Sequence, residues 1–200
     1  MPSRPSSAKN PPLWERARAG VRSEVVETAM RLFAEQGFEA TTIGQIVEEA
    51  GVSRRSFFRY FGTKEDILLG DLMERGAKIA EALRERPADE NPWTALEESF
   101  RTSMGDAPVP TEHDLLVSRL VVETPSLRAA HAAKHQRWQR DLAPVLVERL
   151  RQEPNAELAA NAIVAAALAC LETATQAWVA SGGREDLERL YRQTVAVIRT

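Results

Sequence analysis

Basic and aromatic side chains are concentrated in one short segment of the sequence, Ser53–Lys64. The segment reads SRRSFFRYFGTK and holds four Lys or Arg residues and no acidic residue, whereas the whole chain of 200 residues has a formal net charge of −3. Guanidinium groups can donate paired hydrogen bonds to guanine and can also contact phosphates. Basic residues gathered on one short element are typical of a DNA-reading surface.

Local signals predict that this segment lies on the second of two short helices joined by a tight turn. Thr42 and Gln45 have the spacing of a capping box, which would begin a helix over about 43–50. Gly51 can end that helix in the left-handed conformation without a steric penalty. Ser53 is a good N-cap for the next helix. The pattern predicts a helix-turn-helix, whose second helix enters the major groove.

The second short helix has an apolar side and a basic side. Phe57 and Phe61, four residues apart, would face inward. The outward side would carry Arg54, Arg55, Ser56, Arg59 and Tyr60. A solvated basic turn on a helical protein is the alternative interpretation. The coincidence of a capping box, a glycine turn and a one-sided basic surface favours nucleic-acid binding.

Residues 22–68 resemble the DNA-binding domain of the TetR family of bacterial transcription regulators. The matching residues are Ala29, Leu32, Phe33, Gly37, Phe38, Thr41, Thr42, Ile46, Ala50, Gly51, Val52, Ser53, Phe58, Tyr60, Phe61, Lys64 and Glu65. Two positions depart from the family's pattern. Phe58 stands where the family more often has Tyr, which removes a hydroxyl able to contact a phosphate. Gly44 lies inside the first short helix, where glycine lowers helix propensity by about 1 kcal/mol relative to alanine.

The expected DNA contacts divide into base contacts and backbone contacts. Arg54 and Arg55 are expected to reach base edges, because Arg can form a bidentate pair with guanine. The remaining contacts would hold phosphates and set the register on the duplex; they are Thr42, Ser53, Ser56, Phe58, Arg59, Tyr60 and Lys64.

Composition favours an all-helical protein, because Ala and Leu are abundant and β-branched runs are short. Charge is unevenly distributed along the chain. Residues 1–64 hold ten basic and seven acidic residues, a net of +3, whereas residues 65–200 hold sixteen and twenty-two, a net of −6. A basic N-terminal third followed by an acidic remainder indicates a DNA-binding site confined to the N-terminal third, and not a protein that binds nucleic acids over its whole surface.

Pro, Gly and polar residues that interrupt the helical pattern predict how the chain is divided. Residues 1–12 are rich in Pro and Ser and are expected to be a disordered tail. Residues 13–68 would form the three-helix DNA-binding domain, with a linking helix from 64 onward, and residues 69–200 a helical ligand-binding and dimerisation domain. Helices are expected over 13–36, 43–50, 63–85, 93–104, 114–123, 125–151, 157–181 and 185–198, with a further short helix after its N-cap Ser53, a loop over 105–110 and a kink at Pro144.

The resemblance implies a homodimer that responds to a small molecule. The last two helices would form the dimer interface, where small residues such as Ala162, Ala169 and Ala177 allow close approach; an ordinary intrachain core is the alternative. The effector would be a small apolar or acyl-type molecule. Candidate ligand contacts are Trp93, Phe100, Leu120, His135, Trp138, Leu171 and Trp178, each of which could instead be a core residue.

His131 and His135 are four residues apart and so lie on one helical face, a spacing that can bind a metal. No Cys or acidic residue close in the sequence completes a ligand set, and Lys134 is adjacent. We therefore expect no metal and no cofactor. The two histidines would be polar helix positions or a pH-sensitive part of the pocket rim.

Other functional classes fit the sequence less well. A small-molecule enzyme or carrier would not need an outward row of Arg, and no nucleophile elbow, phosphate loop or zinc signature is present. An architectural DNA binder should be basic overall. Cys170 alone excludes an internal disulfide, and the N-terminus lacks the apolar segment of a signal peptide. The longest weakly polar run, Leu158–Cys170, is too short to span a bilayer. We therefore expect a cytoplasmic protein. Repression is the expected mode of regulation, and activation remains compatible with these residues.

Overall fold

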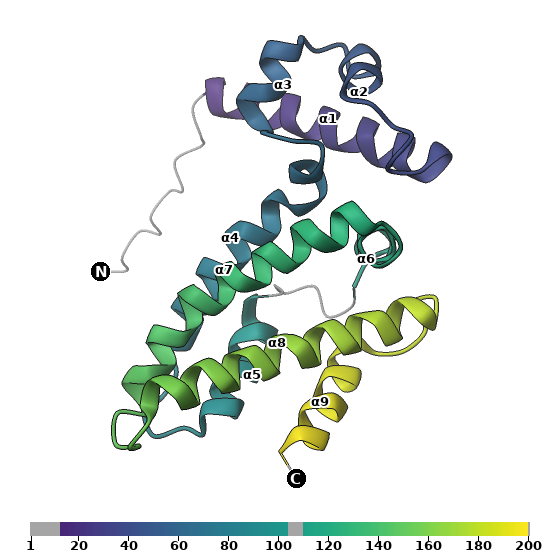
Figure 1. The fold of residues 1–200 in the computed structure, drawn as a ribbon. Helices are drawn as coiled ribbons and strands as arrows, with labels where there is room; N and C mark the ends of the chain where they lie inside the picture. The colour runs from purple at the N-terminus through teal and green to yellow at the C-terminus, as the bar shows by residue number, and fades with distance from the viewer. Residues whose placement is uncertain (1–12, 104–109, 200) are drawn as a thin grey trace, which may run out of the picture. The chain divides into compact units, whose positions relative to one another are not determined.

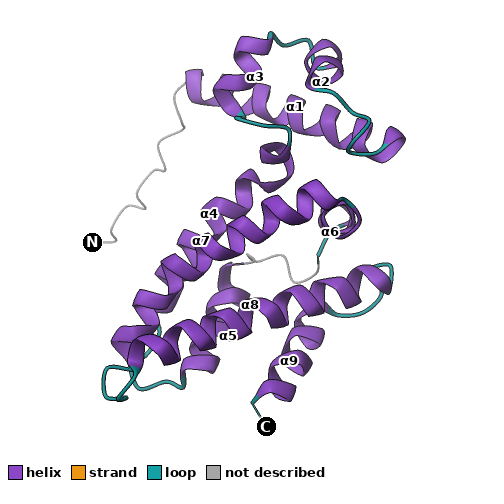
Figure 2. Ribbon diagram, in the orientation of Figure 1, coloured by secondary structure: helices purple, strands orange, loops and turns teal. Residues whose placement is uncertain are grey.

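The computed structural model describes residues 13–103 and 110–199, and within these ranges the secondary structure is helical with no strand (Figures 1 and 2). The helices are α1 (Leu13–Gln36), α2 (Ile43–Glu49), α3 (Arg54–Tyr60), α4 (Glu65–Glu85), α5 (Pro92–Ser103), α6 (Glu112–Glu123), α7 (Pro125–Arg149), α8 (Ala156–Ala180) and α9 (Leu187–Ile198). The predicted all-α fold is confirmed. The expected tail over 1–12 and most of the expected loop over 105–110 lie outside the described residues.

The chain divides into two compact units, residues 1–67 and residues 68–200. The boundary falls in the first turns of α4. The N-terminal unit therefore contains α1, α2 and α3 with the start of α4, and the C-terminal unit contains the rest of α4 and all later helices.

The N-terminal unit is built on the apolar stripe of α1. Val25, Ala29 and Phe33 are fully or almost fully buried. Gly37 ends α1 with a φ of +84°, a conformation that few other residues adopt. The chain then returns over the helix, and Phe38 packs on Phe33 with ring centroids 5.0 Å apart. This core supports α2 and α3.

The core of the C-terminal unit lies between α8 and the helices around it. Its largest fully buried side chains are Leu69, Ile79, Leu83, Leu96, Leu127, Leu142, Leu146 and Val164. Figure 1 shows α7 and α8 side by side, and α8 packs mainly against α7 and α9. Alanine is frequent in α8 because its small side chain permits close helix–helix contact.

Capping residues decide where the helices begin. Thr111 and Asp114 form a capping box at α6, so this helix begins at Glu112, two residues before the expected start. Thr124 occupies the N-cap of α7 without a side-chain capping hydrogen bond, and Pro125 takes the first helical position. The helical assignment of α7 continues through Pro144.

Helix α8 is long and apolar enough to cross a membrane, judged by length and composition alone: it has 25 residues, and its most apolar window has a mean hydropathy of 1.6. The expectation that no apolar stretch is long enough to span a bilayer was therefore wrong. It was based on Leu158–Cys170 alone, whereas the helix that contains this run extends from Ala156 to Ala180. A core helix in a soluble protein passes the same test. Since α8 supplies Val164, Ala167 and Trp178 to the buried core, one such helix is a weak indication of a membrane span.

Arg149 closes the C-terminal end of α4. Its guanidinium donates hydrogen bonds to the carbonyl oxygens of Leu83 (2.6 Å), Arg86 (2.7 Å) and Pro87. The last carbonyls of a helix have no partner within the helix, so a cation there satisfies both their hydrogen bonding and the helix dipole.

Replacing Arg149 with Met is expected to lower the free energy of unfolding by about 1–3 kcal/mol, because a charged donor serving three carbonyls is lost. Urea unfolding followed by circular dichroism measures the change. Arg151→Met is the matched control, since Arg151 is exposed and should change stability by less than about 0.5 kcal/mol. Equal effects of the two substitutions would contradict the capping role.

Candidate nucleic-acid interface

Local hydrogen bonds fix the two short helices as the sequence predicts. The Gln45 amide N–H donates to the Thr42 hydroxyl (3.2 Å), and the Thr42 amide N–H donates to the Gln45 side chain (2.9 Å), which completes the capping box. Gly51 has a φ of +63° in the turn. The Ser56 amide N–H donates to the Ser53 hydroxyl (3.1 Å), so Ser53 caps α3.

Helix α3 separates an apolar side from a basic side. Phe57 and Phe61 are buried, with ring centroids 5.4 Å apart, and hold the helix on the N-terminal unit. Arg54, Arg55 and Arg59 are exposed. The structure therefore presents three guanidinium groups from one short, firmly held helix.

Phe58 lies on the solvent side with 53% of its surface exposed. Its ring meets the edge of buried Phe57 at a centroid distance of 5.3 Å. A large apolar side chain exposed beside three arginines is suited to van der Waals contact with a nucleic-acid backbone. Thr42 and Ser53 are also exposed, at the N-termini of α2 and α3.

Two arginines of α3 have defined surroundings. A Cβ built on Gly44 would lie 3.3 Å from an Arg54 guanidinium nitrogen, so the glycine in α2 leaves room for this side chain. Arg59 donates a hydrogen bond to the Tyr60 hydroxyl (2.7 Å), and its guanidinium carbon lies 4.8 Å from the centre of the Tyr60 ring. Arg59 and Tyr60 thus form one paired group.

Lys64 differs from the other basic candidates because its ammonium group is tied to the N-terminal unit. Its Nζ donates to the carbonyl oxygens of Phe38 (2.6 Å) and Thr41 (2.8 Å) and lies 4.1 Å from the centre of the Phe38 ring. An ammonium group has three N–H donors, so one remains for another acceptor. Sequence patterns do not indicate these bonds, because their partners lie more than twenty residues earlier.

Replacing Lys64 with Met is expected to destabilise the protein by about 1–3 kcal/mol, because two carbonyls lose a charged donor. Thermal unfolding of the free protein measures this effect without DNA. Lys78→Met serves as the control, since Lys78 is an exposed lysine of α4. An unchanged unfolding midpoint for Lys64→Met would show that the two bonds contribute nothing to stability.

The candidate ligand residues are all in the C-terminal unit. Phe100 and Trp138 belong to the buried core, with Trp93 and Leu171 packed against it. Leu120 and Trp178 are buried on α6 and α8, and His135 is half-buried beside Trp138. Phe100 and Leu171 line, with Tyr191, a cavity of about 10 Å³, which is enough for one water molecule.

Comparisons with known proteins agree with this architecture. Residues 25–70 match the bacterial regulatory proteins of the tetR family, and residues 90–200 match the MftR C-terminal domain. The chain is 32% identical over 154 residues to the HTH-type transcriptional regulator TcmR of Streptomyces glaucescens, covering 74% of this chain and 68% of that protein. It is 34% identical over 134 residues to the HTH-type transcriptional repressor AcnR of Corynebacterium diphtheriae, covering 66% and 64% respectively.

A solved structure with the same fold is the transcriptional regulator FadR of Bacillus subtilis in complex with stearoyl-CoA. It aligns with a TM-score of 0.57 over 88% of this chain and 96% of that chain, at 18% sequence identity, which shows a shared fold. The first domain match covers the helix-turn-helix, and the second alone covers more than half of the whole chain. From these matches and the similarity to TcmR, the chain belongs to the TetR family of bacterial regulatory proteins and is a helix-turn-helix, DNA-binding regulator of transcription.

Proposed function

We propose that the protein is a homodimeric repressor that binds a palindromic operator through α3 and is released from it by a small apolar or acyl-type effector. The observation that carries this proposal is the capped helix α3, whose buried Phe57 and Phe61 hold the exposed guanidinium groups in place. A recognition helix must be packed firmly on its domain, because contacts with bases depend on where its side chains lie in the major groove. Repression is also the activity in the name of the relative AcnR.

The exposed residues of α2 and α3 would share the work of DNA binding. Arg54 and Arg55, in the first turn of α3, would contact base edges. The remaining residues would hold phosphates; they are Thr42, Ser53, Ser56, Phe58, Arg59, Tyr60 and the free donor of Lys64. In this assignment the paired Arg59 and Tyr60 contact the DNA backbone as one group.

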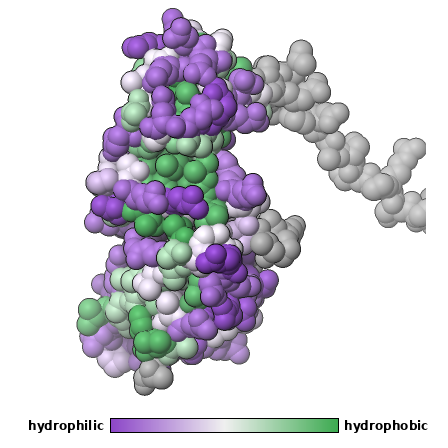
Figure 3. Space-filling view, turned by 90° about the vertical axis from the view of Figure 1, so that its right-hand side faces the viewer, coloured by the Kyte–Doolittle hydropathy of each residue, from purple (hydrophilic) through white to green (hydrophobic). Residues whose placement is uncertain are grey.

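The last two helices offer a surface suited to dimerisation. On α8, the small residues Ala162, Ala169 and Ala177 recur at helical spacing and are exposed in the single chain. Leu158 and Val197 are 72% and 76% exposed. Figure 3 shows hydrophobic surface among polar surface in the lower part of the molecule, where α8 and α9 lie in Figure 1. TetR-family proteins act on DNA as dimers, and a twofold axis would place two copies of α3 on successive major grooves.

Ala169→Arg is expected to prevent dimerisation, because a long charged side chain cannot be buried in a close helix–helix contact. Sedimentation velocity would then show a monomer, with specific operator affinity lost as well. Gln136→Arg, which places the same side chain at an exposed position of α7, should leave the dimer intact. A dimeric Ala169→Arg variant would exclude this face of α8 from the interface.

The effector would enter the C-terminal unit near the small cavity between α5, α8 and α9. A ligand-binding pocket has a volume of roughly 300–1,000 Å³, so side chains must move to admit an acyl chain. The candidates are Trp93, Phe100, Leu120, His135, Trp138, Leu171 and Trp178. FadR of Bacillus subtilis, which shares the fold, was crystallised with stearoyl-CoA. The effector can release DNA only to the extent that it binds the released conformation more tightly.

We also propose that the protein has no enzymatic activity and works in the cytoplasm. The relatives TcmR and AcnR are named as regulators of transcription. The operator it would bind is also a cytoplasmic target in a bacterium.

Selection from random duplex DNA by the purified protein at near-physiological salt tests this function. A palindromic consensus is expected, because two identical recognition helices would read two equivalent half-sites. Binding to the selected DNA should exceed binding to random DNA by about 10³-fold or more. Enrichment of no sequence, repeated after removal of bound small molecules by partial unfolding and refolding, would contradict the proposal.

A further inference from the structure

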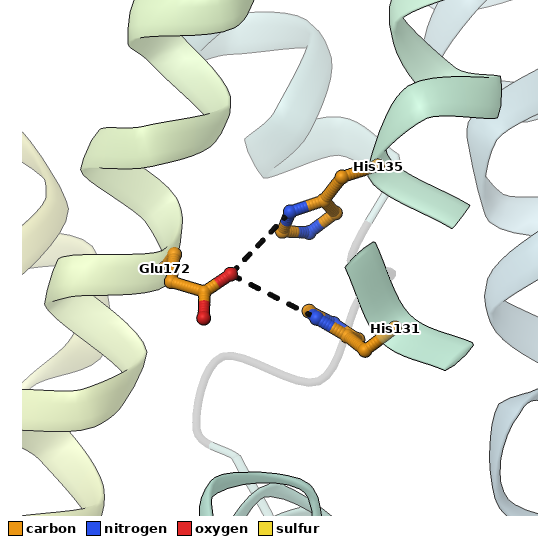
Figure 4. Close-up of side chains that lie close together, drawn as sticks. All are labelled: His131, His135 and Glu172. Carbon is orange, nitrogen blue, oxygen red and sulfur yellow. Dashed lines mark ion pairs between the residues drawn. The ribbon is translucent and has the colours of Figure 1, made fainter. Parts of the chain in front are cut away.

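Helices α7 and α8 bring together three side chains with metal-binding chemistry. His131 and His135 project from adjacent turns of α7 toward Glu172 on α8, and Figure 4 shows the three groups pointing at one another. The Nδ1 atoms of His131 and His135 lie 3.9 Å and 3.5 Å from the same carboxylate oxygen of Glu172. One donor atom from each residue lies within 4.8 Å of the other two.

These separations are close to those of a metal site. Metal–ligand bonds of about 2.0–2.2 Å in a tetrahedral site place neighbouring donor atoms about 3.3–3.6 Å apart. The His135–Glu172 separation of 3.5 Å already lies in this range. Donor atoms as far apart as 4.8 Å would have to move closer by about 1 Å to bind one ion. Two imidazoles and one carboxylate form a donor set that Zn²⁺ and its first-row neighbours accept readily.

Both histidines are available as neutral ligands. Burial, with the nearby His135 and Lys134, lowers the pKa of His131 to about 4. Burial also lowers the pKa of His135, against the opposing charge of Glu172. At neutral pH each imidazole therefore keeps a lone pair. Lys134 is buried next to His131 and would repel a dication, so the charge of Glu172 is needed to offset it.

The surroundings also orient the ligands. The Gln176 side-chain amide donates to the other oxygen of Glu172 (3.3 Å), which leaves the first oxygen facing the histidines. The ring of His135 lies 5.7 Å from that of Trp138, which restricts its rotation. Hydrogen bonds and packing of this kind around the ligands raise metal affinity.

We propose that His131, His135 and Glu172 form a binding site for a divalent first-row transition metal, best matched by Zn²⁺. Three protein ligands leave a fourth position for water or for a donor atom of a bound small molecule. Sequence patterns do not indicate this site, because Glu172 lies about forty residues after the histidines and on another helix. The proposal is independent of the proposed function, since the protein could hold a metal whether or not it binds an operator.

Cobalt titration of the full-length protein, stripped of metal by a chelator, tests the site. Co²⁺ bound by three protein ligands should give intense visible d–d bands that saturate at one ion per chain, and Zn²⁺ should abolish them. His135→Asn and Glu172→Gln should each weaken binding by on the order of 100-fold or more. The His113→Asn control should bind like the wild type, because His113 is exposed on α6, apart from the cluster.

Thermal unfolding provides a second readout. Excess Zn²⁺ should raise the unfolding midpoint of the wild type and of His113→Asn, since a ligand that binds only the folded state stabilises it. It should leave the midpoints of His135→Asn and Glu172→Gln unchanged. The competing explanation is a hydrogen-bonded cluster without metal. Wild-type affinity no tighter than that of Glu172→Gln, or equal loss in His113→Asn, would overturn the proposal.

Discussion

Arg55→Ala is expected to reduce affinity for the selected operator by roughly 30-fold to 20,000-fold and to relax base preference at one position in each half-site. A bidentate arginine–guanine contact contributes about 1–3 kcal/mol of discrimination. A dimer loses two such contacts, or about 2–6 kcal/mol, which gives the stated range. Arg55 is exposed in the first turn of α3, so its removal should not disturb the fold.

Controls separate base recognition from general attraction to DNA. Repeating the selection with Arg55→Ala identifies the relaxed position, and a salt titration counts phosphate contacts from the slope of affinity against salt. Arg184→Ala removes one exposed positive charge from the C-terminal unit and should leave affinity nearly unchanged. Uniformly weaker binding by Arg55→Ala, with its base preference intact and a shallower salt slope, would reassign this side chain to the DNA backbone.

Gly76→Ala is expected to destabilise the protein, although alanine is the better helix former. A Cβ on Gly76 of α4 would lie 2.3 Å from Trp138 Cδ1 and 2.5 Å from its Nε1. Trp138 is a rigid ring with 4% of its surface exposed, so it has little space into which to move. Overpacking of this kind typically costs about 1–3 kcal/mol, enough to exceed the gain in helix propensity of about 1 kcal/mol. Gly76→Val should be worse.

Gly20→Ala provides the matched control for this clash. Gly20 lies in α1, and nothing outside its own helix approaches its missing Cβ within 4 Å. This substitution should therefore be neutral or slightly stabilising in the same thermal unfolding experiment. The double variant Gly76→Ala/Trp138→Leu should lose less stability than the two single variants lose in sum, because the smaller leucine side chain removes the clash. Independent, additive effects of the two substitutions would show that they are not in contact.

Short-range signals in the sequence are sufficient to predict the local structure of α2 and α3. Thr42 with Gln45, Gly51, and Ser53 with Ser56 act within four residues of one another, so their hydrogen bonds and turn follow from types and spacing. Helical periodicity similarly separated buried Phe57 from exposed Arg55. Helix α6 begins two residues before the expected start, because the Thr111–Asp114 capping box, another short-range signal, places its first residue at Glu112.

Contacts between residues far apart in the chain depend on how the helices pack. Only the packed helices show that Lys64 binds carbonyls near Phe38, that Gly76 leaves room for Trp138, and that Glu172 faces the two histidines of α7. Short-range signals fix dihedral angles and caps, because they act through bonds along the chain. Contacts across twenty or more residues depend on how helices pack, and side-chain volumes summed over the whole core determine that packing.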